Sequence, residues 1–177
     1  MKTEIAVFGG GCFWCTEAVF SMLNGVISVK AGYAGGDSLN IDYESVSRGD
    51  TGHAEVIQIE FDPSVIPYRD LLDVFFHTHN PTTMNQQGAD TGTQYRSIIL
   101  YTSEEQKIAA ENFISELENV GEFKDFIVTE IKPLHEFYEA EDYHQNYFAR
   151  NIEAPYCQVV ISPKLTKLRQ KYGTKLK

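Results

Sequence analysis

The sequence predicts an α+β fold, a two-layer sandwich in which helices pack on a mixed or antiparallel sheet with a ferredoxin-like core. Two observations carry this prediction. Segments with strand and helix patterns follow one another in the order strand, helix, strand, and then strand, helix, strand, helix, strand. Elements mixed in this way generally bury their apolar faces against each other in two layers. At 177 residues the chain can bury a core, and we expect one domain over residues 1–177.

The first elements are separated by glycines. Ile5–Phe8 is a short apolar run that predicts a buried strand, and three glycines at positions 9–11 then turn the backbone. A helix is expected from Cys12, because apolar residues follow at helical spacing. These residues are Cys15, Val19, Met22 and Leu23. Gly25 can end the helix, and Val26–Tyr33 suits a second strand.

The middle of the chain repeats the pattern. Ala54–Phe61 predicts a strand because its side chains alternate between two faces, and Glu55 shares a face with the apolar residues. Those residues are Ile57, Ile59 and Phe61. A helix should begin at Tyr68, since Leu71, Leu72 and Phe75 follow at helical spacing. A polar loop at 80–92 and a strand at 96–101 come next.

The last third holds one clear helix and several weaker signals. Ser103 and Gln106 form a capping box before a helix with a predicted apolar side. That side would hold Ala110, Phe113, Leu117 and Val120. We expect a strand at Phe126–Ile131, a helix at Glu139–Ile152 and a strand at Gln158–Ile161. The last fourteen residues carry six basic side chains and no acidic one, which is typical of a solvated helix or a frayed end.

The composition excludes some classes of partner. The formal net charge of −10 argues against nucleic-acid binding, which would need a basic face. No apolar run approaches the roughly 20 residues that cross a bilayer, and the N-terminus lacks the apolar stretch of a signal peptide. Three cysteines are an odd number that does not suggest a disulfide-stapled secreted fold. We therefore expect reduced thiols in a cytoplasmic protein without nucleic-acid or membrane partners.

Cys12 is the strongest candidate for a reactive group. The glycine turn places it at the start of a helix, where free backbone N–H groups and the helix dipole favour a thiolate over a thiol. Phe13 and Trp14 follow it, and aromatic rings beside a thiol can form a pocket for a small apolar group. The residues alone leave open a buried cysteine that merely fills the core.

Cys15 and Glu55 extend the candidate site. Cys15 lies three residues after Cys12, so the two form a C-x-x-C pair that is either redox-active or part of the apolar stripe. A zinc site would need further ligands, and only His77 and His79 form another close pair. Glu55 points toward a core, where burial should raise its pKa and keep it able to donate a proton, unless it reaches water at the strand end.

Five segments occur together in one order and spacing. They are Gly10–Trp14, Tyr43–Val46, Thr51–Glu55, Gly88–Ser97 and Tyr143–Gln145. In these segments the chain resembles the A-type peptide methionine sulfoxide reductase family, over nearly its whole length. The resemblance implies one catalytic domain that reduces the S epimer of methionine sulfoxide, protein-bound or free, with no metal and no flavin or nicotinamide cofactor.

The resemblance also implies roles for individual residues. Cys12 would attack the sulfoxide sulfur, and Glu55 would protonate the sulfoxide oxygen. The remaining implied site residues are Tyr43 and Tyr95, which hold the oxygen, Asp90, which orients its partners, and Phe13 and Trp14, which hold the substrate methyl group. Cys12 would then carry the oxygen as a sulfenic acid. A second thiol would form a disulfide with it, and thioredoxin would reduce that disulfide.

The second thiol has two candidates. Cys157 lies close to the position of the family's tail cysteine, and Cys15 matches a branch with a short C-x-x-C. Cys157 is slightly favoured, because a helical i, i+3 pair must distort to close a disulfide of normal geometry. Two other functions remain open from the residues: a thioredoxin-like dithiol oxidoreductase using Cys12 and Cys15, and a non-catalytic module that binds oxidised or methionine-rich peptides.

Overall fold

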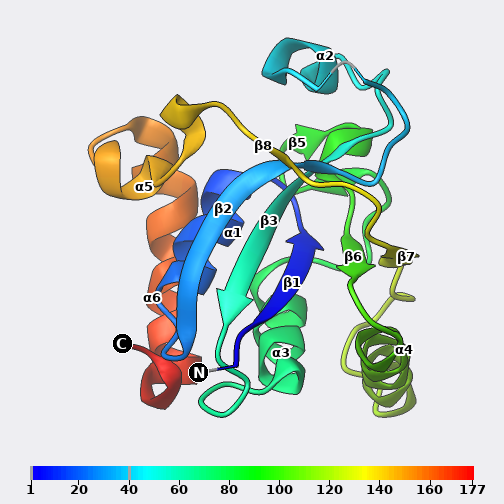
Figure 1. Ribbon diagram of the computed structural model, residues 1–177. Helices are drawn as coiled ribbons and strands as arrows, with labels where there is room; N and C mark the ends of the chain where they lie inside the picture. Colours follow the sequence, from blue (N-terminus) through cyan, green and yellow to red (C-terminus); the bar gives the residue numbers. More distant parts are fainter. Residues whose placement is uncertain (1, 40) are drawn as a thin grey trace.

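The computed structural model describes residues 2–39 and 41–177. Within them, six strands form one sheet in the order β7-β6-β1-β3-β2-β8 (Figure 1). The strands are β1 Glu4–Gly9, β2 Val26–Ala34, β3 Ala54–Phe61, β6 Ile98–Tyr101, β7 Glu130–Pro133 and β8 Tyr138–Glu139. Neighbours are antiparallel except the parallel pair β6 and β7, so the sheet is mixed. The four central strands have the ferredoxin-like order, and the predicted fold class is confirmed.

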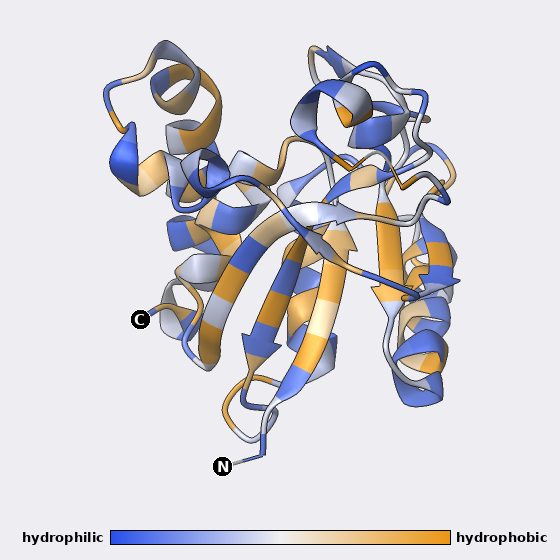
Figure 2. Ribbon diagram, turned by 45° about the horizontal axis from the view of Figure 1, so that its top comes forward, coloured by the Kyte–Doolittle hydropathy of each residue, from blue (hydrophilic) through white to orange (hydrophobic). Residues whose placement is uncertain are grey.

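The helices gather mainly on one face of the sheet (Figure 1). They are α1 Phe13–Ser21, α2 Tyr43–Ser47, α3 Tyr68–Thr78, α4 Glu104–Asn119, α5 Tyr147–Arg150 and α6 Ser162–Tyr172. The main core lies between this layer and the sheet, where the Phe8 ring stacks on Phe75 at 4.8 Å and lies 5.7 Å from Phe20. Figure 2 shows apolar residues running along the central strands. This packing is the two-layer sandwich expected from the sequence.

The other face of the sheet has a smaller apolar cluster that includes Val7, Val56 and Ile98. Leu134 and Phe137 cover it, and they come from the chain that leads from β7 to β8. These two side chains shield this smaller apolar cluster from water.

Two element predictions and one core-residue prediction for the last third are wrong. The expected strand at Gln158–Ile161 is a π-helical turn, Cys157–Ile161, that continues into α6. Its buried residues recur at helical spacing through that helix, as Cys157, Ile161, Leu165, Leu168 and Tyr172. The expected helix at Glu139–Ile152 is instead β8, a 3₁₀ turn at Asp142–His144 and the short α5, because Asn146 adopts a left-handed conformation with φ 52°. Val120, predicted to face the core, is 73% exposed at the end of α4.

Short elements complete the chain. Strands β4 (Gln86–Gln87) and β5 (Asp90–Thr91) form a separate hairpin within the loop predicted at 80–92, and 3₁₀ turns lie at Thr93–Tyr95 and Gly173–Lys175. The strand predicted at Phe126–Ile131 begins only at Glu130.

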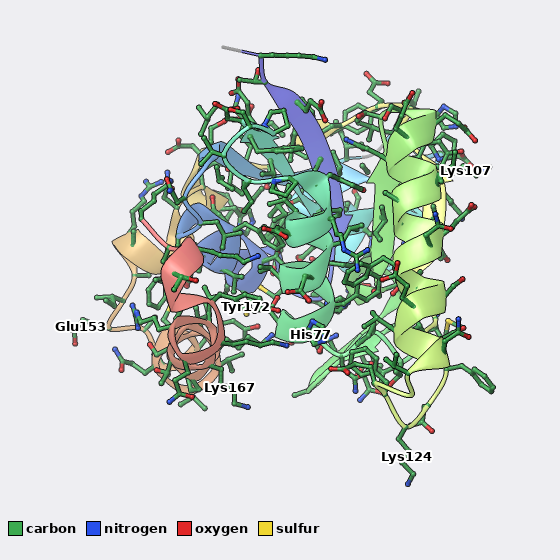
Figure 3. The ribbon with its side chains drawn as sticks, turned by 90° about the horizontal axis from the view of Figure 1, so that it is seen from below. His77, Lys107, Lys124, Glu153, Lys167 and Tyr172 are labelled. Carbon is green, nitrogen blue, oxygen red and sulfur yellow. The ribbon has the colours of Figure 1, made fainter. Side chains whose placement is uncertain are left out.

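The basic tail is helical rather than frayed. It forms α6 and the following turn, where Lys175 Nζ donates to Asp70 Oδ2 at 2.6 Å. A cleft of about 710 Å³ separates α6 from the end of α3, and Figure 3 shows Tyr172 and His77 beside it. Across residues 2–39 and 41–177, no helix has both the length and the apolar character required to pass through a lipid bilayer.

Candidate active site

The predicted site residues meet at one end of the sheet, where β1 ends and β3 begins, below α2 and the β4–β5 hairpin (Figure 1). A pocket of about 190 Å³ lies there. It is lined by Cys12, Phe13, Trp14, Tyr43, Glu55, Asp90, Tyr95 and Tyr156. All the predicted site residues except the two candidate resolving cysteines therefore line a single pocket, although more than eighty residues separate Cys12 from Tyr95 in the sequence.

The glycine turn brings Cys12 into this position. A Cβ at Gly9 would lie 2.9 Å from the Glu55 carbonyl oxygen, so only glycine lets β1 pass this close to β3. Gly11 has φ +95°, and a Cβ there would lie 2.6 Å from Gln87 Cγ on the hairpin. Cys12 is the N-cap of α1, and its carbonyl oxygen accepts a hydrogen bond from the Cys15 N–H at 3.1 Å.

Glu55 is a buried acid beside this turn. Its side chain is 3% exposed, and its Oε2 accepts a hydrogen bond from the Phe13 N–H at 3.2 Å. Burial is the main cause that raises its pKa to about 8, and the charge of Asp90 adds to the shift against the lowering effect of the Phe13 N–H. The alternative that Glu55 reaches water at the strand end is thereby excluded. At neutral pH Glu55 is largely protonated and can donate its proton.

The thiols of Cys12 and Cys15 interact, and each shifts the pKa of the other. This interaction, followed by burial and the charge of Glu55, raises the pKa of Cys12 well above its ordinary value, although the Trp14 N–H acts the other way. The same interaction lowers the pKa of Cys15 to about 7, helped by the charge of Lys164 and opposed by burial. The start of the helix acts in the predicted direction, since the Trp14 N–H lowers the Cys12 pKa, but the neighbouring thiol outweighs it. The pair loses its first proton near neutral pH and retains the second.

Tyr156 contacts both Cys15 and Asp90 of the β4–β5 hairpin. Its hydroxyl donates to Asp90 Oδ2 at 3.2 Å and lies 3.6 Å from Cys15 Sγ. Cys157 is fully buried and does not line the pocket, although the charge of Cys15 contributes to its raised pKa. Sequence reasoning missed Tyr156, whose only local signal is its place next to the third cysteine.

Tyr43 and Tyr95 also line the pocket. Burial is the largest cause that raises the pKa of both hydroxyls, and the charge of Glu55 adds to it in each case. Both hydroxyls therefore keep their protons at neutral pH and can donate hydrogen bonds into the pocket.

Aromatic side chains form the remaining wall. The Trp14 ring stacks on Tyr147 with centroids 3.6 Å apart and planes inclined by 6°. Its Nε1–H donates to His144 Nδ1 at 3.0 Å. Phe13 is fully buried, with its ring 5.6 Å from Tyr33 and 5.0 Å from His144, so it supports the pocket from below. Tyr147 and a role for His144 were not predicted.

Comparison with known proteins gives a consistent result. A family model described as peptide methionine sulfoxide reductase matches residues 4–176. A relative from Saccharolobus solfataricus, named peptide methionine sulfoxide reductase MsrA, is 54% identical over 175 residues, which cover 98% of this chain and 97% of the relative. A protein of the same name from Deinococcus radiodurans is 55% identical, with 98% of this chain and 84% of that protein covered.

Solved structures are similar as well. Mxr1 from Saccharomyces cerevisiae in its reduced form superposes with a TM-score of 0.80 at 36% identity, covering 88% of this chain and 90% of that one. Methionine sulfoxide reductase A of Corynebacterium diphtheriae gives a TM-score of 0.77 at 34% identity, covering 86% and 76%. A structure of Mxr1 in complex with Trx2 gives a TM-score of 0.57 at 28% identity, covering 82% and 85%.

Proposed function

The chain belongs to the peptide methionine sulfoxide reductase family and reduces methionine sulfoxide to methionine, and we propose that Cys12 and Glu55 carry out this reaction in the pocket at the end of the sheet. The observation that carries the proposal is the buried carboxyl of Glu55, which its pKa of about 8 keeps protonated at neutral pH. This carboxyl accepts a hydrogen bond from the N–H of Phe13, the residue directly after Cys12. An acid is needed here because the sulfoxide oxygen is a poor leaving group until it is protonated, and dithiol exchange forms no such oxygen leaving group.

The first half-reaction moves one oxygen between two sulfur atoms. The Cys12 sulfur attacks the sulfoxide sulfur while Glu55 gives its proton to the sulfoxide oxygen. The S–O bond of the substrate breaks, an S–O bond to Cys12 forms, and two electrons reduce the substrate sulfur to the thioether of methionine. Cys12 becomes a sulfenic acid, and the proton from its thiol returns to Glu55.

Other residues hold the substrate during this step. Tyr43 and Tyr95 keep their hydroxyl protons and would donate hydrogen bonds to the sulfoxide oxygen. Asp90 would act through Tyr156, whose hydroxyl it accepts at 3.2 Å. Trp14 would contact the substrate methyl group with its partly exposed ring, and Phe13 would support it from below. The substrate of our scheme is the S epimer of methionine sulfoxide, free or protein-bound.

Cys15 rather than Cys157 is the resolving thiol of our scheme. In the reduced enzyme the pKa of Cys15 is lowered to about 7, chiefly by its interaction with Cys12, which favours a thiolate on Cys15 at neutral pH. That thiolate displaces hydroxide from the sulfenic acid, which leaves as water once protonated, and a Cys12–Cys15 disulfide remains. Cys157 is fully buried outside the pocket, which supports a later role in exchange with Cys15 instead of first contact with Cys12.

Thioredoxin is the reductant of the final step, through thiol–disulfide exchange at the disulfide of Cys12. The complex of Mxr1 with Trx2 supports this partner. We also propose that the chain acts as one catalytic domain in the cytoplasm. The match of the family model to residues 4–176 supports the first point, and the three unbonded cysteines support the second.

Mass spectrometry after one equivalent of methionine sulfoxide tests the scheme. We expect one equivalent of methionine and a disulfide between Cys12 and Cys15. Cys12→Ser should give no methionine even with excess thiol reductant, and a variant that still formed it would refute the proposal. A non-catalytic peptide-binding module would keep its function in Cys12→Ser.

A further inference from the structure

We propose that His79 is a positioning residue for the nucleophile, because its imidazole ring closes off the glycine turn that carries Cys12. The inference rests on the proposed function, in which Cys12 attacks the sulfoxide sulfur. His79 does not line the substrate pocket, so any effect that it has on the reaction is indirect. It is the C-cap of α3, and a Cβ at Gly10 would lie only 3.0 Å from its ring atom Cγ.

The His79 ring lies at the end of the sheet, beside the strands that lead to the turn. Gly9 of β1 pairs with Ile98 of β6, and Ile98 pairs with Glu130 of β7. The residues one step beyond these pairs, at the same end of the sheet, are Gly10, Ser97 and Thr129. His79 packs against the first of them, bonds to the second and reaches the third through Ser97. The ring therefore connects the end of α3 to three strands where β1 gives way to the turn.

The hydrogen bonds of His79 define its tautomer. A backbone carbonyl is only an acceptor, so Nδ1 carries the proton and donates it to the carbonyl oxygen of Phe75. In the neutral ring Nε2 is then an acceptor, and it takes the hydroxyl proton of Ser97 at 2.8 Å. Ser97 Oγ in turn accepts from Thr129 Oγ1, also at 2.8 Å. Both ring nitrogens have partners, and burial, which lowers the pKa of His79 to about 4, keeps the ring uncharged near pH 7.

The turn is thereby restricted from α3 as well as from the hairpin. The His79 ring lies 4.1 Å from the Phe75 ring between centroids, and both rings leave no room for a side chain at Gly10. Gly11, the next residue, packs against Gln87 of the β4–β5 hairpin. A turn held in this way keeps the Cys12 sulfur in one position. This matters because a displacement of about 1 Å at a reacting group can slow a reaction by about 10²-fold.

Two histidines of the same helix separate positioning from a general loss of stability. His79→Phe retains a ring at the turn but loses both hydrogen bonds. His77→Phe is the matched control, because His77 also bonds to a carbonyl four residues earlier, that of Asp73 at 2.8 Å, and lines the same cleft. None of the atoms closest to the three glycines belongs to it. In single-turnover assays we expect His79→Phe to lower the maximal rate of methionine release by about 10- to 100-fold. The half-saturating concentration should change little, and His77→Phe should react like the wild type.

Thiol titration gives a readout that a merely structural role would not move. The thiolate absorbance of the Cys12–Cys15 pair should appear at a different pH in folded His79→Phe and at the wild-type pH in His77→Phe. A folded His79→Phe variant with the wild-type rate and titration would overturn the inference, as would equal slowing in both variants.

Ser97→Ala takes the place of His79→Phe if the latter does not fold. It removes only the hydroxyl that donates to Nε2, and it should slow methionine release in the same way. An unchanged maximal rate in Ser97→Ala would then refute the role of His79. A wild type that released no methionine would contradict the proposed function instead.

Discussion

Replacing Glu55 with glutamine should slow the reaction and, at neutral pH, stabilise the fold. Glutamine keeps the size of the side chain and an oxygen for the Phe13 N–H, but it has no acidic proton to give. We expect methionine formation to slow by at least about 10²-fold, the usual lower scale for a lost general acid. In the wild type the same acid is lost as pH rises through the Glu55 pKa of about 8, so the rate of oxygen transfer should fall above that pH.

The effect on stability follows from the raised pKa. Glu55 has a pKa of about 8 in the fold and about 4.5 in the unfolded chain. Between these values the folded state binds one more proton than the unfolded state, so the free energy of unfolding falls as pH rises. Near pH 7 the free energy of unfolding of the wild type is therefore about 3 kcal/mol lower than it would be with a side chain that never ionises. Glutamine removes this loss, whereas near pH 4.5 the two proteins should differ little.

Two measurements check this reasoning on the same protein. Single-turnover methionine release near pH 7 reports the acid, and urea unfolding near pH 4.5 and pH 7 reports the ionisation. Glu111→Gln, at an exposed glutamate on α4, is the matched control and should change neither. The reasoning is refuted if Glu55→Gln reacts at nearly the wild-type rate. It is also refuted if the stability difference between variant and wild type is the same at both pH values.

Three further substitutions test the surroundings of Cys12. Cys15→Ser should release one equivalent of methionine and leave a sulfenic acid on Cys12 that dimedone labels; sustained turnover with thioredoxin would contradict a resolving role. Gly11→Ala should destabilise the fold by about 1–3 kcal/mol in urea unfolding, because φ is +95° and a Cβ would lie 2.6 Å from Gln87 Cγ; unchanged stability would refute the close contact. Tyr156→Phe should raise the pKa of Cys15, seen as a later thiolate absorbance in a pH titration, and an unshifted titration would argue against their hydrogen bond.

The fold could be predicted where periodicity was strong. Ala54–Phe61 was predicted with its observed bounds, since alternation over eight residues is hard to mistake for a helix. Gln158–Ile161 was misread because its four residues, taken alone, resemble a strand. The buried spacing continues into α6, and Pro163 favours the first turn of a helix rather than a strand. The helix predicted at 139–152 does not form, because side chains such as Gln145 make hydrogen bonds to the backbone of β2. No local sequence pattern predicts such long-range bonds.

The site residues also divide into those with a local sequence signal and those without one. Cys12 had a glycine turn before a helix as its signal, and Glu55 was an acid on an apolar strand face. Both line the same pocket, where Glu55 is buried and Cys12 is half-buried. The raised Cys12 pKa could not be anticipated, since it depends on the interaction with the Cys15 thiol and on burial. His144 had no local signal either, because its contact with Trp14 spans 130 positions in the sequence.

The segment that carries Glu141, His144 and Tyr147 is attached along the outer edge of β2. Its β8 residues pair with Gly32 and Tyr33, and Gln145 exchanges two hydrogen bonds of 2.9 Å with the Ala31 backbone. Local unfolding of this edge segment would leave the central strands intact while removing the support behind Trp14. Activity should therefore be lost at a lower temperature than global unfolding. A protease that cleaves this segment should inactivate the enzyme without unfolding it.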